Sequence, residues 1–215
     1  MNPRLRCLLA LAFPLAGCGI SANKGDSGAA QGPVDPCGQA AELHRPPTDE
    51  LELSYVIDDV QRIVFGAELR DVEVGLAPLP SETDFFNAGV DLTTADLPGL
   101  ERRYIIRANS AIFSGDEPPI GATTAIVAHE LEHVLDYTAM SGDELVDFAL
   151  EYSEGDISQY ERQTDEAVMV RGCATGLKAY REWLYEQLDA EAEAAKRRDY
   201  YTPDEIDAWV ADHGG

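Results

Sequence analysis

The sequence predicts an α+β fold in which a small, mostly antiparallel sheet with an edge strand packs against two long helices. Apolar residues make up 45% of the 215 residues, and no apolar run reaches the roughly 20 residues that a membrane-spanning helix needs. Short segments with strand-like alternation are confined to residues 71–113, and helical spacing dominates from residue 122 onward. A helix, then strands, then further helices is the order typical of an α+β domain.

The first 17 residues are predicted to be a signal peptide that is removed. Arg4 and Arg6 give a short positive region, and residues 7–16 form an apolar run of signal-peptide length. The run ends in Leu-Ala-Gly-Cys, which resembles the bacterial lipobox. That resemblance implies that Cys18 is acylated (with palmitate, for example) and becomes the new N-terminus. The alternative is an ordinary secretory signal that happens to contain a cysteine.

Residues 18–40 are predicted to form the lipidated cysteine and a flexible tether, because residues 19–36 are rich in Gly, Ala, Ser and Pro. The folded domain is then predicted over residues 41–215, beginning between Cys37 and Pro47. These features place the protein in the bacterial cell envelope. By resemblance to lipoprotein sorting in enterobacteria, Gly19 after the cysteine favours the outer membrane.

The charge excludes several classes of partner. Removal of Arg4 and Arg6 with the leader leaves 14 basic against 40 acidic side chains, a net charge of −26. Such a surface repels nucleic acid and anionic lipid headgroups. We therefore expect no nucleic-acid partner, and membrane attachment only through the N-terminal lipid.

Two cysteines, Cys37 and Cys173, remain after processing. An envelope compartment permits disulfides, so a bridge between them is predicted. The alternative is one free thiol in the tether and one in a buried helix.

Four elements are predicted before residue 115. Thr48 is the expected N-cap of a helix over residues 49–65 that ends at Gly66. Strands are predicted by the remaining apolar patterns, and the last of them is the most apolar. These strands cover residues 71–76, 85–92 and 102–113.

Helices follow to the end of the chain. The predicted helices cover residues 123–139, 143–152 and 158–188, and the pattern leaves open a continuation of the last helix to residue 198. A final short helix begins at Pro203 and ends before Gly214.

The segment 128–133, Ala-His-Glu-Leu-Glu-His, carries the strongest functional signal. On a helix, His129 and His133 project from one face and can bind one Zn²⁺ ion. Glu130 lies close enough to hold a water molecule without pointing at the metal. The alternative is a solvent-exposed helix rich in Glu and His. Against this, two of only four histidines occupy the ligand spacing, and the flanking side chains predict a buried helix. These side chains are Val127, Leu131, Val134, Leu135 and Thr138.

A third ligand is expected from a separate segment downstream. Glu161 and Asp165 are four residues apart on a predicted helix. Together with His129, Glu130 and His133 they resemble the gluzincin clan of zinc metallopeptidases, which includes thermolysin. The resemblance covers about residues 100–180 in motif order and is specific at these five positions. It implies that Glu161 is the third zinc ligand and that Asp165 orients a zinc-binding histidine, His129.

Other third ligands stay open on the residues alone. Glu151, Glu154 and Asp165 are rivals, and Asp136 is disfavoured because it shares a helix with His133. The alternative for Glu161 and Asp165 is a solvated acidic face. Small residues continue that face and predict close packing on the histidine helix. They are Val168, Gly172, Thr175 and Ala179.

The same resemblance implies two further parts of the site. An edge strand should precede the zinc helix and pair with the substrate backbone, and residues 102–113 are in the expected place, with 108–111 as the pairing stretch. The alternative is an ordinary inner strand, which periodicity does not distinguish from an edge strand. A Tyr or His should stabilise the oxyanion, and the sequence does not choose among six candidates. They are Tyr137, Tyr152, Tyr160, Tyr200, Tyr201 and His213.

The sequence therefore predicts a lipid-anchored zinc metallopeptidase that hydrolyses a peptide or protein substrate, with Glu130 as general base. The alternative is a non-catalytic lipoprotein in which zinc serves structure or partner recognition. An intact Glu130 favours the enzyme, because a structural zinc site has no use for it.

Overall fold

Three strands form one sheet in the order β1–β3–β2. The protein is described by a computed structural model, which covers residues 35–213. The strands are β1 (Glu73–Pro78), β2 (Phe86–Val90) and β3 (Arg103–Ala108). β1 pairs with β3 in parallel, and β2 pairs with β3 antiparallel. The α+β class is confirmed, but the sheet is mixed rather than mostly antiparallel.

β3 is the central strand. Tyr104, Ile106 and Ala108 alternate as its buried side chains, which is the pattern of a strand with one face on the core. The prediction that residues 102–113 form an edge strand is wrong, because β3 is paired on both sides. The strand also ends at Ala108, since the side chain of Asn109 accepts a hydrogen bond from the amide of Ala111 and starts a 3₁₀ turn.

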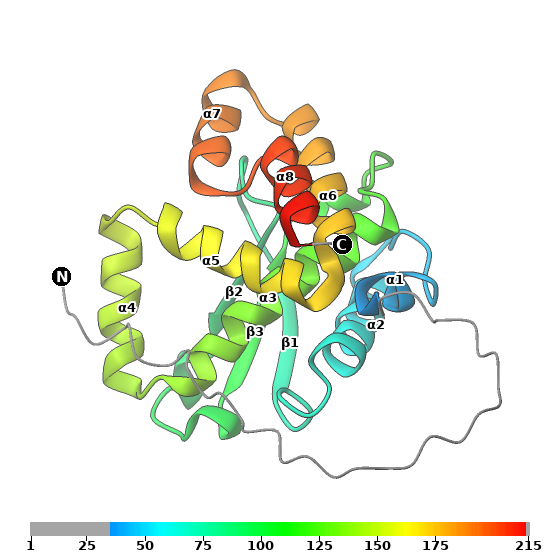
Figure 1. Cartoon of the computed structure of the whole chain (residues 1–215). Helices are drawn as coiled ribbons and strands as arrows, with labels where there is room; N and C mark the ends of the chain where they lie inside the picture. Colours follow the sequence, from blue (N-terminus) through cyan, green and yellow to red (C-terminus); the bar gives the residue numbers. More distant parts are fainter. Residues whose placement is uncertain (1–34, 214–215) are drawn as a thin grey trace, which may run out of the picture. The chain divides into compact units, whose positions relative to one another are not determined.

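The described residues also form eight α-helices (Figure 1). They are α1 (Pro36–Ala41), α2 (Glu50–Val60), α3 (Ile120–Ala139), α4 (Gly142–Glu154), α5 (Ser158–Val168), α6 (Ala174–Gln187), α7 (Ala190–Asp199) and α8 (Pro203–His213). π-helical turns continue α2 to Phe65 and connect α5 to α6. Helix α2 is capped by Asp49 rather than by the predicted Thr48. None of the described helices is long and apolar enough to cross a membrane.

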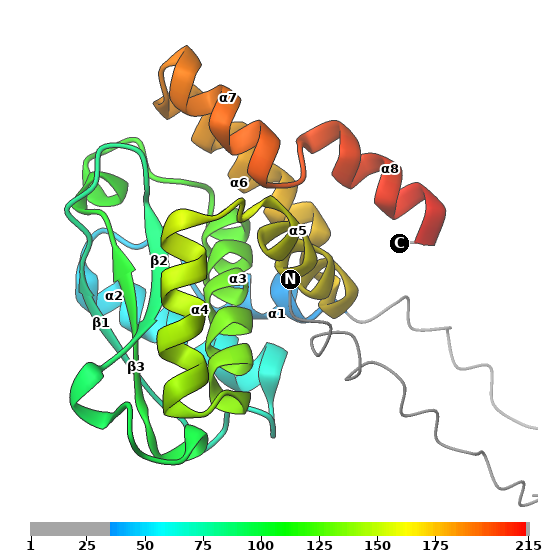
Figure 2. The ribbon, with the colours of Figure 1, turned by 90° about the vertical axis from the view of Figure 1, so that its left-hand side faces the viewer.

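α3 is the central helix and contacts β2, β3, α5 and α6 (Figure 2). It begins at Ile120, directly after Pro118 and Pro119, three residues earlier than predicted. Its C-terminal end is held by the buried side chain of Arg102, which donates to the carbonyl oxygens of Tyr137 at 3.2 Å and Met140 at 2.7 Å. These contacts satisfy carbonyls that a helix end leaves without partners.

The predicted long helix over residues 158–188 is two helices with a kink between them. Gly172 has a φ of 90°, a conformation that favours glycine, and this separates α5 from α6. The closest approach to α3 lies on α6, where a Cβ atom at Gly176 would overlap the carbonyl oxygen of Gly121. The helix after residue 158 does pack closely on α3, as predicted. The closest contact, however, is made by Gly176 and not by the predicted row of small residues that includes Gly172.

A disulfide joins Cys37 to Cys173, with 5.1 Å between the Cα atoms. It connects α1 to the kink between α5 and α6. Both cysteines are buried. Helix α1 lies partly within the stretch predicted as tether, and its first turn is capped by Asp35. The predicted signal peptide, Cys18 and most of the predicted tether lie outside the described residues.

Candidate metal centre

Helix α3 carries three of the predicted site residues on its buried side. His129, Glu130 and His133 are 2%, 4% and 5% exposed. Burying a polar side chain costs folding free energy unless the side chain has a hydrogen-bonding or charged partner. The residues that contact these three side chains therefore define the rest of the site. Helix α5 supplies the first of them, because it crosses α3 beside the histidines (Figures 1 and 2).

Three potential ligand atoms converge between α3 and α5. The Nε2 atoms of His129 and His133 are 3.2 Å apart. Oε2 of Glu161 lies 3.1 Å from His129 Nε2 and 3.4 Å from His133 Nε2. Ligands about 2.0–2.1 Å from a tetrahedral zinc ion are separated by about 3.3 Å, so these spacings fit one ion. His129, His133 and Glu161 could therefore hold a metal ion.

The rival ligands lie elsewhere or have other partners. Glu151 is exposed, and Asp136 and Asp165 are not part of the converging group. The side chain of Glu154 is not described. Among the candidates whose side chains the structure describes, Glu161 is the carboxylate that lies beside both histidines, and its role as a ligand stays a prediction.

Asp165 lies behind His129, as the resemblance implied. Its Oδ1 atom is 2.9 Å from His129 Nδ1 and 2.9 Å from Nη2 of Arg181. The N–H direction of His129 is not well aligned with the carboxylate, so the first contact is an ion-pair contact rather than a full hydrogen bond. Oδ2 accepts a hydrogen bond from the backbone amide of Tyr201 at 3.0 Å. The buried carboxylate of Asp165 thus contacts His129 on α3, Arg181 on α6 and the backbone just before α8.

Two phenols contact the other two candidate ligands. Tyr152 donates to Oε1 of Glu161 at 2.6 Å, and the hydroxyl of Tyr160 lies 3.0 Å from Nδ1 of His133. Tyr160 is partly buried and Tyr152 is 37% exposed. Loss of hydration, together with the neighbouring Glu161 carboxylate, raises the pKa of both phenols above the usual value, so both are protonated. Sequence reasoning had named these residues only as candidates for oxyanion stabilisation.

The protonation of the ligands follows from their neighbours. Burial alone would raise the pKa of Glu161, but hydrogen bonds from His129 and His133 outweigh it and lower that pKa. Burial would lower the pKa of His129, whereas Asp165 and Glu161 raise it to about 10. The centre therefore holds a strongly bound proton that a cation of higher charge can replace.

Glu130 faces a small cavity beside the histidines. Burial raises the pKa of its carboxyl group, which makes it a stronger base once ionised. The cavity has a volume of about 20 Å³, room for about one water molecule. Its wall combines α3 and α6 with the chain just before β2 and with α7. Its lining includes His129, Glu130, Tyr180, Arg181, Lys196 and Tyr200.

Of the six candidates for oxyanion stabilisation, Tyr200 lines this cavity. Its ring centroid lies 5.9 Å from that of His129, and burial raises its pKa well above the usual value. Tyr201 instead bonds the exposed Glu166, and His213 stacks on Trp209 near the end of α8. The structure thus places Tyr200 beside Glu130, and Tyr152 and Tyr160 beside the ligands.

Sequence reasoning missed Arg181 and Lys196. Arg181 is 2% exposed and stands over the ring of Tyr200, with 4.3 Å between its Cζ atom and the ring centroid. Lys196 on α7 pairs with Asp84 at 2.6 Å, and both residues line the cavity. A signal for Arg181 existed, because it shares a helical face with buried apolar residues. They are Leu177, Tyr180 and Leu184.

No family model, no curated protein and no solved structure matches the chain.

Proposed function

We propose that the protein is a zinc-dependent peptidase. The observation that carries the proposal is the convergence of His129, His133 and Glu161 within 3.1–3.4 Å of one another, with Glu130 facing the adjoining cavity. Two imidazoles and one carboxylate leave a fourth position open, which is the composition of a catalytic rather than a structural zinc site.

Zinc, when bound there, supplies a Lewis acid that polarises the scissile carbonyl and an attacking water molecule. Glu130 accepts the proton of that water and later donates it to the leaving amine. Its buried position and raised pKa suit this exchange. Tyr200 lines the same cavity as Glu130, and its role in this proposal is to donate a hydrogen bond to the oxygen that becomes negative.

Backbone pairing with the substrate falls to β2 instead of β3. β2 is an edge strand within the described sheet, and the chain entering it, Asp84 to Phe86, lines the cavity next to Glu130. An extended peptide could add to this edge with little side-chain preference.

The direct test compares Glu130→Gln with wild type. The amide keeps the shape but removes the basic oxygen, so zinc should still bind one to one while hydrolysis of a quenched fluorescent peptide library falls by about 10²–10⁴-fold. Glu132→Gln is the matched control on the same helix, since Glu132 pairs with Arg171 rather than facing the cavity. Full activity in Glu130→Gln would overturn the proposal.

The alternative function is a non-catalytic zinc-containing binding module, and the narrow cavity beside Glu130 favours it. Room for about one water is too little for a peptide side chain. This alternative predicts zinc binding in wild type and in Glu130→Gln with no peptide cleavage by either.

We also propose that the domain is anchored to the bacterial envelope through Cys18, on the basis of the lipobox alone. A fatty-acid probe should label cells that express wild type and not cells that express Cys18→Ala. Equal labelling of both would exclude lipidation at Cys18.

A further inference from the structure

Each of the three candidate ligands has a polar contact on the side that faces away from the convergence point. His129 has the carboxylate of Asp165, as a resemblance to gluzincins implies. The other two ligands instead meet phenols: Tyr152 bonds Glu161, and Tyr160 contacts His133. Neither contact is needed for Glu130 to act as general base or for Tyr200 to stabilise the oxyanion.

We propose that Tyr152 and Tyr160 are positioning residues that fix which atoms of Glu161 and His133 face the metal. The inference rests on the proposed zinc site. Tyr152 holds Oε1 of Glu161 at 2.6 Å, so that Oε2 alone points toward the two histidines. Glu161 then offers one oxygen rather than two.

Tyr160 acts in the corresponding way on His133. When Nε2 of His133 binds a metal, its Nδ1 carries the ring proton, and the hydroxyl oxygen of Tyr160 at 3.0 Å accepts that hydrogen bond. The acceptor fixes the tautomer and the ring plane, as partners of metal-bound histidines generally do.

An aromatic cluster keeps both phenols in place. Phe148 packs against Tyr152 and Tyr160, with ring centroids 5.7 Å and 5.0 Å away, and the Tyr160 ring stacks 5.1 Å from that of His133. Phe148 and Tyr152 belong to α4, whereas Tyr160 belongs to α5. Helix α4 thereby contributes to the metal centre without supplying a ligand.

The test uses Tyr152→Phe and Tyr160→Phe, which keep the rings and remove one hydroxyl each. Zinc affinity, measured by competition with a chromophoric chelator, should fall about 10–100-fold in each variant. Tyr201→Phe is the matched control, because it removes a phenol bonded to Glu166 on the outer side of α5. Its zinc affinity should equal that of wild type.

Replacing zinc with Co²⁺ distinguishes a change in how the ligands are positioned from a general loss of fold stability, because the visible Co²⁺ spectrum reports the coordination number. Tyr152→Phe releases Oε1, so Glu161 can bind through both oxygens, and the visible Co²⁺ absorption should weaken as the coordination number rises. Tyr160→Phe should keep the coordination number. Thermal unfolding of each variant in the presence of a chelator measures the loss of fold stability separately from the loss of zinc affinity.

Wild-type zinc affinity in both site variants, or an unchanged Co²⁺ spectrum in Tyr152→Phe, would overturn the inference while leaving the proposed function intact. Wild type that binds no zinc would instead overturn the proposed function.

Discussion

At the residue scale, the site is defined by what each buried polar side chain touches. His129, His133 and Glu161 converge, Asp165 lies behind His129, and Glu130 faces the cavity. His129, Glu130 and His133 could be predicted from their spacing on one helix, whereas the roles of Glu161 and Asp165 followed only from the resemblance to the gluzincins. The phenols could not be assigned, since their roles depend on how α4 and α5 meet, which periodicity does not encode.

Glu161 and Asp165 should differ sharply when each is changed to Ala. Loss of Glu161 removes one of three ligand atoms, whereas loss of Asp165 removes only a partner of His129 and should cost about 10–100-fold in zinc affinity. Chelator competition gives both dissociation constants. If Glu161→Ala binds zinc as tightly as wild type, the ligand assignment is wrong.

The proton on His129 predicts a pH dependence. Its pKa of about 10 in the metal-free protein lies above the reference value of 6.5, so the proton stabilises the fold below pH 6.5 and this contribution disappears as the pH rises toward 10. Zinc must displace the same proton, so zinc affinity should rise over this range. Calorimetry in buffers of different ionisation enthalpy should detect its release, and zinc binding without proton uptake by the buffer would contradict the prediction.

At the element scale, the helices were predicted better than the sheet. Helix α3 begins directly after Pro119, and α8 begins at Pro203 and ends before Gly214. The spacing of the apolar residues between these boundaries is helical. The order β1–β3–β2 depends on pairing between segments about 30 residues apart in sequence, such as Glu73 with Arg103, and this is not visible in local periodicity. The kink at Gly172 was missed because a glycine inside a helical pattern does not reveal its φ angle.

Gly176 should be intolerant of a side chain. A Cβ atom there would overlap the carbonyl oxygen of Gly121 and would contact Ala125, where α6 crosses α3. Overpacking of this kind costs about 1–3 kcal/mol in unfolding free energy, so urea denaturation of Gly176→Ala should show a clear loss.

Gly121→Ala is the control in the facing helix. A Cβ atom at Gly121 meets nothing within 4 Å, so this change should be neutral or stabilising by about 0.5–1 kcal/mol. Equal stability of the two variants would mean that the helices do not approach as closely as described.

At the scale of the whole domain, a disulfide bond joins the first helix, α1, to the connection between α5 and α6. Cys37 and Cys173 are 136 residues apart in sequence, and their disulfide ties α1 to the kink that separates α5 from α6. A long connection of this type restricts the unfolded chain more than a short one. The bond therefore restrains the kink that follows α5, the helix that carries Glu161.

Removal of the disulfide should destabilise the domain without changing the ligands. The chain-entropy model gives roughly 5 kcal/mol for a loop of this length, as an upper figure. Chemical denaturation of the Cys37→Ser, Cys173→Ser double variant should show a large loss relative to wild type. Two free thiols in non-reduced wild type, measured by mass spectrometry, would contradict the bridge.

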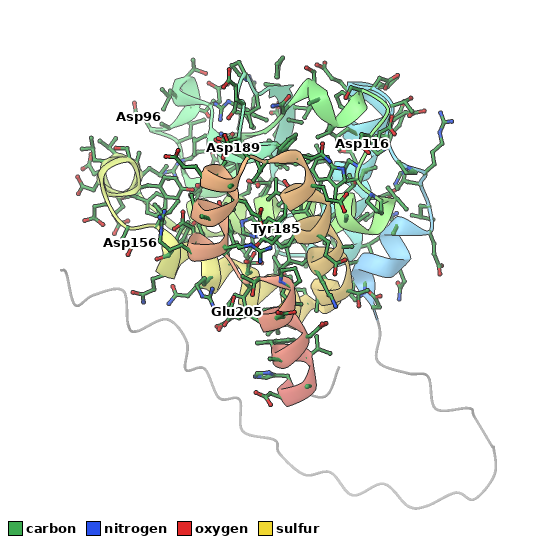
Figure 3. All side chains as sticks on the ribbon, turned by 90° about the horizontal axis from the view of Figure 1, so that it is seen from above. Asp96, Asp116, Asp156, Tyr185, Asp189 and Glu205 are labelled. Carbon is green, nitrogen blue, oxygen red and sulfur yellow. A yellow bond between two sulfur atoms is a disulfide. The ribbon has the colours of Figure 1, made fainter. Side chains whose placement is uncertain are left out.

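Another property of the whole domain is the arrangement of α6 and α7 around the cavity. Figure 3 shows the two helices side by side with Tyr185 between them, and Arg197 of α7 stands over the Tyr185 ring at 4.1 Å. Helix α7 has no large apolar side chain. Its position at the cavity depends on such polar contacts, including Lys196 with Asp84.

The most direct test of the central claim is crystallography of the zinc-loaded domain, with anomalous data collected on both sides of the zinc absorption edge. We expect one strong peak about 2.0–2.1 Å from Nε2 of His129, Nε2 of His133 and Oε2 of Glu161, with a fourth position facing Glu130. A peak bound by other residues, or a site closed by a fourth protein ligand, would contradict it.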